Sequence, residues 1–268
     1  MRNSRPRGRR MGRESTRPRS AAGDPGGSLP GQCHNPRMTR TAIVSAMQEE
    51  LSAVLALLPD EHRQPVGGRD YWVGHLHGQE VVAVLSRIGK VAAATTATAL
   101  IERFGVERIV FTGVAGGLAP GVNRGDVVIA DSFLQHDLDA SPLFPRYEVP
   151  LYGTDRFSTD PGLTEQLAAA VGQALHGTQV HRGLVASGDR FVSSAAESQA
   201  LQRAVPDALA VEMEGAAIAQ VCHDYGIPFA AVRTVSDRAD DMAHIDFATF
   251  LRDVASRHSA AIVRALLA

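Results

Sequence analysis

Hydrophobic residues along this chain follow two alternating patterns. Short runs of apolar and β-branched residues are typical of buried strands, and longer stretches with apolar residues at a helical spacing lie between them. The expected strands are residues 41–47, 108–112, 125–131, 182–187, 209–211 and 229–235, and the expected helices are 51–58, 92–104, 163–175, 217–225 and 247–267. This alternation predicts an α/β protein with three αβα layers around a central mixed, mostly parallel sheet.

Two segments interrupt the alternation. Residues 71–77 and 80–86 carry strand-like patterns on either side of Gly78, which predicts a β-hairpin. Residues 141–160 are rich in proline, tyrosine and phenylalanine, and we expect an ordered loop with exposed apolar surface there. A loop of this kind is a candidate interface with a partner.

The first 37 residues differ in composition from the rest of the chain. They hold nine arginines and only two acidic residues, a net charge of +7, and they contain no apolar segment. We expect residues 1–37 to be a disordered basic leader or a start codon placed too early, because Met38 directly precedes the first strand. A nucleic-acid tail or a transit peptide is the alternative. Residues 38–268 are then a single domain, for which the leader is expected to be dispensable.

The rest of the chain is acidic and has few cysteines. It holds 18 basic and 27 acidic residues, a net charge of −9, so we do not expect nucleic-acid binding. No run of 18 apolar residues predicts a membrane-spanning helix. Cys33 and Cys222 are too few for a metal cluster, and they favour a reduced, cytoplasmic protein. We expect no metal, no cofactor and no covalent nucleophile.

Charged residues stand at or near the ends of two expected strands. Glu212 and Glu214 follow the strand 209–211, whereas Arg233 interrupts the strand 229–235 and Asp237 closes it. Open α/β sheets bind ligands at the carboxyl ends of their strands, so these residues predict a site. A buried structural ion pair between Arg233 and one of the two glutamates is the alternative.

Three other strand ends lead into candidate binding segments. Residues 46–50 place Glu50 in the first turn of a helix, where the helix dipole also favours carboxylates. Residues 113–117 predict a glycine-rich backbone turn that a ligand can approach, although they match no phosphate-loop or dinucleotide fingerprint. Residues 187–192 form a polar turn with an aromatic residue. His136 lies between acidic residues, but without a second histidine a hydrogen-bonded loop is favoured over a metal site.

The motifs at these positions resemble those of one enzyme family, the 5′-methylthioadenosine/S-adenosylhomocysteine nucleosidases of the nucleoside phosphorylase superfamily. The similarity extends from residue 41 to the carboxyl terminus with every motif in order, which is more specific than any single motif. In chain order the motifs are Ala46-Met47-x-x-Glu50, Ile88-Gly89-Lys90-Val91, Thr112-Gly113-x-Ala115-Gly116-Gly117, Gly125-Asp126-x-Val128, Ser187-Gly188-Asp189-x-Phe191, Val211-Glu212-Met213-Glu214 and Ser236-Asp237-x-Ala239-Asp240.

The resemblance implies hydrolysis of the N-glycosidic bond of methylthioadenosine and adenosylhomocysteine, which releases adenine and a 5-thioribose product. It implies that Asp237 protonates adenine N7 with help from Ser236, and that Glu50 orients or deprotonates the attacking water. The implied binding residues are Glu214, Met213 and Arg233 at the ribose hydroxyls, Phe191 and the backbone of Val192 at adenine, and Met47, Ile88, Ala115 and Gly116 along the ribose and alkylthio side.

The chemistry of glycosidic-bond hydrolysis independently requires an acid and a carboxylate, the kinds of residue that the motifs contain. An oxocarbenium-like transition state needs an acid behind the leaving group and a carboxylate toward the water. A purine nucleoside phosphorylase is the nearest alternative, but the anion-binding arginine and serine of those enzymes are absent, and paired carboxylates at residues 49 and 50 repel phosphate. Val114 departs from those nucleosidases that carry serine at this position.

Further alternatives concern the substrate and the class of protein. Residues 135–139 resemble relatives that act on aminodeoxyfutalosine in menaquinone synthesis, so the choice between that pathway and methionine salvage stays open. A non-catalytic nucleoside-binding protein of the same fold would be expected to lack Asp237 or Glu50, and both are present. The resemblance also implies a homodimer in which residues 140–152 cap the partner's alkylthio pocket, with Leu143 and Phe144 as candidate contacts.

Overall fold

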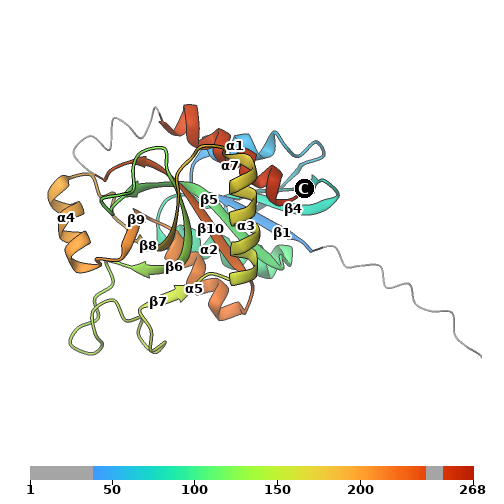
Figure 1. Ribbon diagram of the computed structural model, residues 1–268. Coiled ribbons are helices and arrows are strands. Elements are labelled where there is room, and N and C mark those ends of the chain that lie inside the picture. Colours follow the sequence, from blue (N-terminus) through green and yellow to red (C-terminus); the bar gives the residue numbers. More distant parts are fainter. Residues whose placement is uncertain (1–38, 240–249) are drawn as a thin grey trace, which may run out of the picture. The chain divides into compact units, whose positions relative to one another are not determined.

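The computed structural model describes residues 39–239 and 250–268, in which strands and helices alternate along much of the chain (Figure 1). The strands are β1 (Thr41–Ser45), β2 (His62–Val66), β3 (Arg69–Leu76), β4 (Gln79–Leu85), β5 (Arg108–Gly117), β6 (Val127–Gln135), β7 (Arg156–Ser158), β8 (Val180–Ser187), β9 (Ala208–Glu212) and β10 (Phe229–Asp237). The helices are α1 (Gln48–Leu55), α2 (Lys90–Phe104), α3 (Pro161–Ala174), α4 (Ala195–Ala204), α5 (Gly215–Tyr225), a π-helical segment η1 (Leu251–Ala255) and α7 (Ser256–Leu266). The expected leader, residues 1–37, and the first residues of the last expected helix lie outside the described residues.

The ten strands of the described residues form one mixed sheet. Parallel pairings join β1 to β4 and β5, β5 to β10, and β8 to β6 and β9. Antiparallel pairings add β3 and β2 beyond β4, and β7 beside β6. Strand β10 pairs with both β5 and β6, and β5 also pairs with β9, so β5, β10, β6, β8 and β9 close into a ring. The predicted mixed sheet is confirmed, whereas its partial closure was not predicted.

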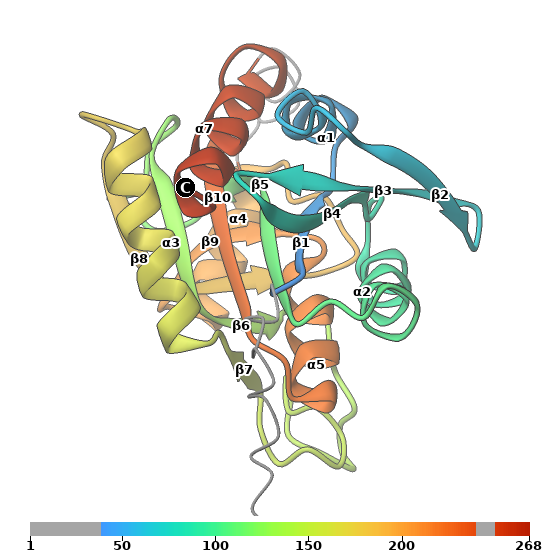
Figure 2. The same ribbon diagram turned by 90° about the vertical axis from the view of Figure 1, so that its right-hand side faces the viewer.

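Helices cover both faces of the sheet, which gives the three predicted layers (Figure 2). Helices α2 and α5 pack together on one face, where Ala93, Ala97 and Ala216 bring them close to the strands. Helices α1, α3 and α7 lie on the other face and contribute Leu51, Leu167 and other apolar residues to a second core. Each face therefore has its own hydrophobic core. Within the described part of the chain, no helix is both long enough and apolar enough to cross a membrane.

Several local predictions hold, and others need correction. Strands β3 and β4 form the expected hairpin around Gly78, and β2 extends it with a strand that was not predicted. Helix α5 ends at Gly226, which adopts a left-handed conformation with φ of 64°, the expected helix cap. Helix α1 ends at Leu55, so the expected continuation to residue 58 is wrong. Helix α4 was not predicted.

The predicted glycine turn at residues 113–117 is wrong, because β5 continues as a strand to Gly117. These glycines instead allow close contacts between strands and side chains. A Cβ atom on Gly113 would lie 2.7 Å from Arg233 Nη1, and one on Gly116 would lie 3.1 Å from Asp237 Oδ1 and 2.9 Å from the Cβ of Ala239. The absence of side chains at these two positions therefore makes room for charged groups at the edge of the sheet.

Candidate active site

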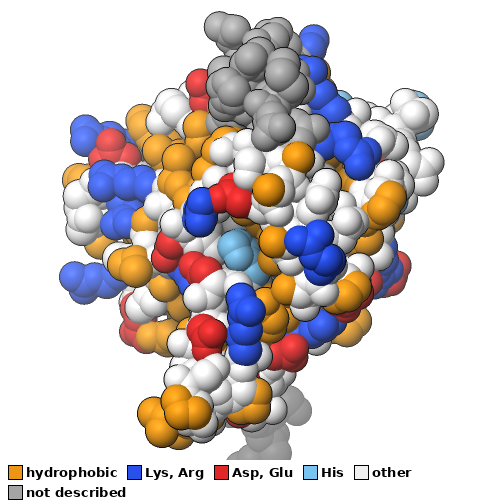
Figure 3. Space-filling view, turned by 90° about the vertical axis from the view of Figure 1, so that its left-hand side faces the viewer, with side chains coloured by type: hydrophobic (Ala, Val, Ile, Leu, Met, Phe, Trp, Pro, Cys, Tyr) orange, Lys and Arg blue, Asp and Glu red, His pale blue; other side chains and the backbone are white. Residues whose placement is uncertain are grey.

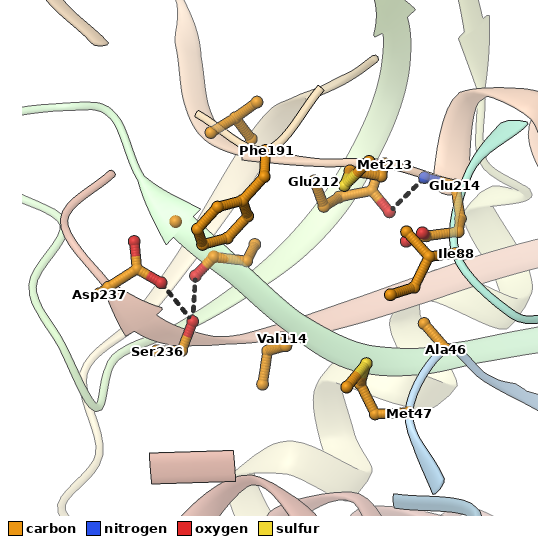
Figure 4. A pocket seen from close by; sticks show the side chains of 13 residues that line it. Ala46, Met47, Ile88, Val114, Phe191, Glu212, Met213, Glu214, Ser236 and Asp237 are labelled. Atoms are coloured by element: carbon orange, nitrogen blue, oxygen red, sulfur yellow. Dashed lines mark hydrogen bonds between the residues drawn. The ribbon is translucent and has the colours of Figure 1, made fainter. Parts of the chain in front are cut away.

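A cavity of about 420 Å³ opens where several strands end, a volume in the range of small-molecule sites. Figure 4 shows Asp237 and Ser236 on one side of this cavity, and Met47, Ile88 and Glu214 on the other. The register of the strands explains the convergence. Gly116 at the end of β5 pairs with Asp237 of β10 and also with Val211 of β9, so three strand ends meet at one residue.

Asp237 is fixed at the end of β10 by neighbouring groups. Its side chain is buried, and Oδ1 accepts a hydrogen bond of 2.7 Å from the backbone N–H of Ala239. Ser236 Oγ lies 2.7 Å from Asp237 Oδ2 and 3.3 Å from the carbonyl oxygen of Ala115. These contacts hold the carboxyl group in one orientation at the edge of the cavity.

Glu212 is the most heavily bonded carboxylate of the site. It accepts hydrogen bonds from the backbone N–H groups of Glu214 at 3.2 Å and Gly215 at 2.9 Å, and from the Ser187 hydroxyl. Its Oε2 also lies 2.7 Å from Arg233 Nη2. The ion pair that was considered as the alternative role of Arg233 is therefore formed with Glu212, at the end of β9 and just before α5, where a helix N-terminus favours a negative charge.

Glu214 lies beside this carboxylate and is also buried. The backbone N–H of Gly89 donates a hydrogen bond of 2.9 Å to Glu214 Oε1, which links the end of β9 to the start of α2. Burial raises the pKa of Glu214 to about 8, and the charge of Glu212 acts in the same direction. Glu214 therefore keeps its proton to a higher pH than a free carboxyl group, and its protonated form can both donate and accept hydrogen bonds in the cavity.

Glu50 and Arg233 lie behind the residues that line the cavity. Both side chains are almost fully buried, and the Arg233 guanidinium carbon stacks 3.5 Å from the ring centre of Phe111. Glu50 Oε2 accepts a hydrogen bond of 3.2 Å from the backbone N–H of Met47. Burial raises the pKa of Glu50 to about 7, although Arg233 opposes the shift.

Two polar atoms of this buried pair approach the same place. Glu50 Oε1 and Arg233 Nη1 have no hydrogen-bond partner among residues 39–239 and 250–268. A Cβ atom on Gly113 would lie 3.6 Å from Glu50 Oε1 and 2.7 Å from Arg233 Nη1, so both atoms face the side of β5 that carries no side chain. An oxygen atom of a ligand or water placed between them would be bonded by an acceptor and a donor.

Most of the predicted site residues come together at this cavity. Val192 lines a smaller adjoining cavity of about 20 Å³, whereas Glu50 and Arg233 lie one layer deeper than the expected rim. The predicted residues that line the main cavity are Asp237, Ser236, Glu214, Met213, Phe191, Ala115, Gly116, Ile88 and Met47.

Four further residues line the cavity, within or beside the expected segments but without a predicted binding role: Ala46, Val114, Val211 and Glu212. Glu212 was expected near a site and as a possible partner for Arg233, but no binding role was assigned to it, although its position two residues before Glu214 in the same motif was an available signal. Val114 packs against a buried cluster that contains Phe250 and Leu251, so an apolar side chain occupies this part of the wall. Ala46 and Val211 belong to two of the recognised motifs, but no binding role was assigned to them.

The loop between β6 and β7 presents apolar side chains to solvent. Leu143 is 83% exposed and Leu151 is 92% exposed, large fractions for leucine in a folded chain. Figure 3 shows apolar side chains gathered at the lower end of the face from which this loop projects. The expected exposed apolar surface is therefore present.

The polar residues after β6 form no metal site. His136 Nε2 is buried without a hydrogen-bond partner in the described residues, while Asp137 pairs with Lys90 at 2.6 Å. Across residues 39–239 and 250–268, no group of three or more His, Cys, Asp and Glu side chains is placed to hold a metal ion. The backbone N–H of His136 donates a hydrogen bond of 2.9 Å to the carbonyl oxygen of Ser187.

The chain is similar in sequence to proteins of known families. A sequence profile described as the phosphorylase superfamily matches residues 40–268. A 5′-methylthioadenosine/S-adenosylhomocysteine nucleosidase of Geobacillus thermodenitrificans is 37% identical over 229 residues, which cover 85% of this chain and 96% of that protein.

Solved structures agree with this assignment. The Neisseria meningitidis 5′-methylthioadenosine/S-adenosylhomocysteine nucleosidase, solved with methylthio-immucillin-A, superimposes with a TM-score of 0.81 at 36% identity, covering 86% of this chain and 99% of that one. A futalosine hydrolase of Helicobacter pylori gives a TM-score of 0.80 at 33% identity, covering 86% and 97%. The chain therefore belongs to the phosphorylase superfamily and, within it, to the family of 5′-methylthioadenosine/S-adenosylhomocysteine nucleosidases.

Proposed function

We propose that this protein hydrolyses the N-glycosidic bond of 5′-methylthioadenosine and S-adenosylhomocysteine. The observation that carries the proposal is the arrangement of carboxyl groups: Asp237 faces one end of the cavity, and Glu50 lies behind the other wall with a pKa of about 7. Separated carboxyl groups of this kind allow one acid to act on a leaving group while another acts on water. The family assignment supports the same reaction.

Asp237 acts on the leaving group in this proposal. Adenine leaves more easily when N7 is protonated, because the base then departs without a negative charge. The contacts of Asp237 with Ser236 and the Ala239 backbone hold its carboxyl group in one orientation for this transfer. Phe191 stacks on the adenine ring, and the backbone of Val192 reads its edge.

The ribose lies between the two ends of the cavity. Glu214 and the neighbouring Met213 bind its hydroxyl groups, and the protonated form of Glu214 suits hydroxyls that both donate and accept. Met47, Ile88, Ala115 and Gly116 line the ribose and alkylthio side. Arg233 acts from behind the wall, fixed by Glu212.

The attacking water lies between Glu50 Oε1 and Arg233 Nη1 in this proposal, which gives both otherwise unpartnered atoms a bond. A general base works best when its pKa is close to the working pH, and the pKa of Glu50 is about 7. Glu50 takes a proton from the water as its oxygen attacks C1′. The proton added to adenine comes from Asp237, so acid and base are separate groups.

The same groups support hydrolysis over phosphorolysis. Phosphate carries its own negative charge, and the cavity that it would enter is lined by the carboxyl groups of Glu212, Glu214 and Asp237, with no Lys or Arg among the described lining residues. Arg233, the cation closest to that place, already pairs with Glu212 at 2.7 Å. A phosphorylase would need an uncommitted cation there.

The test is adenine release from methylthioadenosine, with and without inorganic phosphate. We expect release at the same rate in both buffers. Release that depends on phosphate would assign the protein to the phosphorylases. If neither methylthioadenosine, adenosylhomocysteine nor aminodeoxyfutalosine were cleaved, a non-catalytic nucleoside-binding role would replace this proposal.

We further propose that the active form is a homodimer in which residues 140–152 cap the partner's alkylthio pocket. The exposed Leu143 and Leu151 support this proposal, because an interface would remove these side chains from water. A role in methionine salvage and a cytoplasmic location also stay predictions.

Replacing Leu143 by aspartate is expected to weaken the dimer and raise KM by about tenfold, since it places a charge in an apolar interface. Val180→Asp is the matched control, because Val180 is an exposed apolar residue at the start of β8, outside the loop. Sedimentation velocity measures the oligomeric state of both variants, and steady-state kinetics measure their KM for methylthioadenosine. A Leu143→Asp protein with unchanged mass and KM would contradict the proposed cap.

A further inference from the structure

A separate, smaller cavity has no role in the proposed reaction but is lined by chain neighbours of active-site residues. Its volume is about 170 Å³, and two of its lining residues are chain neighbours of active-site residues. Gln48 follows Met47, and Arg87 precedes Ile88, so the two cavities share the same two chain segments. The second cavity is lined by Gln48, Leu51, Gly68, Arg69, Asp70, Trp72, Leu85 and Arg87.

Arg87 has an unusual backbone conformation at the boundary between these cavities. Its φ angle is 66°, in the left-handed region that costs energy for residues other than glycine. Residues held in such conformations cluster at functional sites, where the surrounding structure maintains the strain. A glycine would relieve the strain, so the presence of arginine calls for a role of its side chain.

The second cavity holds positive charge that carboxylates do not neutralise. Among residues 39–239 and 250–268, neither Arg69 nor Arg87 forms an ion pair, whereas Asp70 pairs with the exposed Arg63 at 2.8 Å. The two arginines donate only to backbone oxygens, Arg87 to Gly68 at 2.6 Å and Arg69 to Ala92 at 3.3 Å. Arg69 Nε is buried and has no partner among the described residues. Most of their N–H donors are therefore available to a ligand.

The direction of the proposed substrate leads toward these arginines. With adenine near Asp237 and Phe191, the 5′ substituent points to the opposite side of the cavity, where Met47 and Ile88 lie (Figure 4). In this binding mode, a substituent longer than a methylthio group would extend past these two side chains in the direction of their chain neighbours, Gln48 and Arg87.

We propose that Arg87 and Arg69 form a subsite for a carboxylate at the far end of the 5′ substituent. This inference rests on the proposed nucleosidase function. Adenosylhomocysteine carries such a carboxylate on an amino-acid tail, and methylthioadenosine does not. Arginine binds carboxylates through two parallel hydrogen bonds, which gives direction as well as charge. The subsite thus determines preference among 5′ substituents.

The test compares three nucleosides: methylthioadenosine, adenosylhomocysteine and 5′-butylthioadenosine, whose tail is long but uncharged. In the Arg87→Gly variant, the ratio of kcat/KM for adenosylhomocysteine to kcat/KM for methylthioadenosine is expected to fall by about tenfold. The ratio of kcat/KM for butylthioadenosine to kcat/KM for methylthioadenosine is expected to stay within about twofold of wild type, because the butylthio tail carries no charge for the arginines to bind. Arg87→Lys is expected to retain part of the preference. Arg103→Gln, which removes a charge from the end of α2, is the control.

The outcomes separate this inference from the proposed function. If the wild type cleaves these nucleosides but Arg87→Gly leaves the adenosylhomocysteine ratio unchanged, the carboxylate subsite is wrong and the nucleosidase function stands. An equal loss for all three substrates would also overturn it, because Arg87 would then only hold the turn at Gly68. If the wild type cleaves none of them, the proposed function itself fails. If the ratio of kcat/KM for adenosylhomocysteine to kcat/KM for methylthioadenosine in the wild type also falls as salt is added, this result would support the subsite.

Discussion

Replacing Asp237 by asparagine is expected to lower kcat for adenine release by at least about 10² to 10⁴, the usual contribution of general acid catalysis. Asparagine has nearly the same shape and can keep the contacts with Ser236 and the backbone N–H of Ala239, but it cannot deliver a proton. The structure around residue 237 should therefore survive the change. Single-turnover rates of adenine release from methylthioadenosine measure the effect.

The control is Asp131→Asn, because Asp131 pairs with Arg182 away from the cavity. That variant is expected to keep wild-type kcat. A second check is KM, which should change little in Asp237→Asn, because the proton is needed in the transition state more than in substrate binding. An Asp237→Asn protein with kcat within tenfold of wild type would rule out Asp237 as the acid.

Glu50→Gln is expected to remove most activity and, at the same time, to stabilise the folded protein above neutral pH. Burial raises the pKa of Glu50 from 4.5 to about 7, so the folded state holds its proton more tightly than the unfolded state. Its contribution to the free energy of unfolding therefore declines as pH rises from about 4.5 to 7 and stays at its lowest value above pH 7. The difference is on the order of 3 kcal/mol.

Glutamine removes this cost because it carries no charge at any pH. The melting temperature of Glu50→Gln should exceed that of wild type by several degrees at pH 8, and the difference should vanish near pH 4.5, where both side chains are neutral. Thermal unfolding at both pH values measures it. A variant that is destabilised equally at both pH values would contradict the assigned burial of a charged base.

The pH dependence of activity provides a second readout for Glu50. A general base must be deprotonated, so wild-type kcat/KM is expected to fall as pH decreases below about 7. The residual kcat/KM of Glu50→Gln should not show this fall below pH 7. Retention of the fall in Glu50→Gln would assign it to another group.

Much of the fold was predictable because local patterns agree with the final structure. The apolar strand at residues 229–235 is continuous enough to be recognised despite Arg233, and its neighbour α5 shows apolar residues at helical spacing up to Gly226. Where local pattern and tertiary structure agree in this way, secondary structure can be predicted from the sequence. The expected position of a site followed from the same reasoning, since Glu214 comes just after β9 and Asp237 ends β10, and both strands pair with β5.

The prediction failed where long-range pairing decides the structure. Residues 113–117 contain three glycines, which are typical of a turn, yet β5 remains extended because β10 and β9 pair with it on either side. Likewise, the sequence offered both Glu212 and Glu214 as partners for Arg233. Only the packing of Ser187 and the start of α5 around Glu212 decides between them.

Burial of Glu50 is a further property that the sequence could not supply. Its position in the first turn of α1 is common for exposed carboxylates, which the helix dipole favours. In this protein β5 and Arg233 cover it, and the glycine at residue 113 leaves space beside its Oε1 atom. The raised pKa and the proposed catalytic role both depend on that tertiary contact.

The central claim is that water, and not phosphate, attacks the ribose. The most direct measurement is the reaction of methylthioadenosine in ¹⁸O-labelled water that contains inorganic phosphate, with the sugar product analysed by mass spectrometry. The claim predicts free methylthioribose with one ¹⁸O atom on C1 and no sugar phosphate. A methylthioribose 1-phosphate product without the label would contradict it.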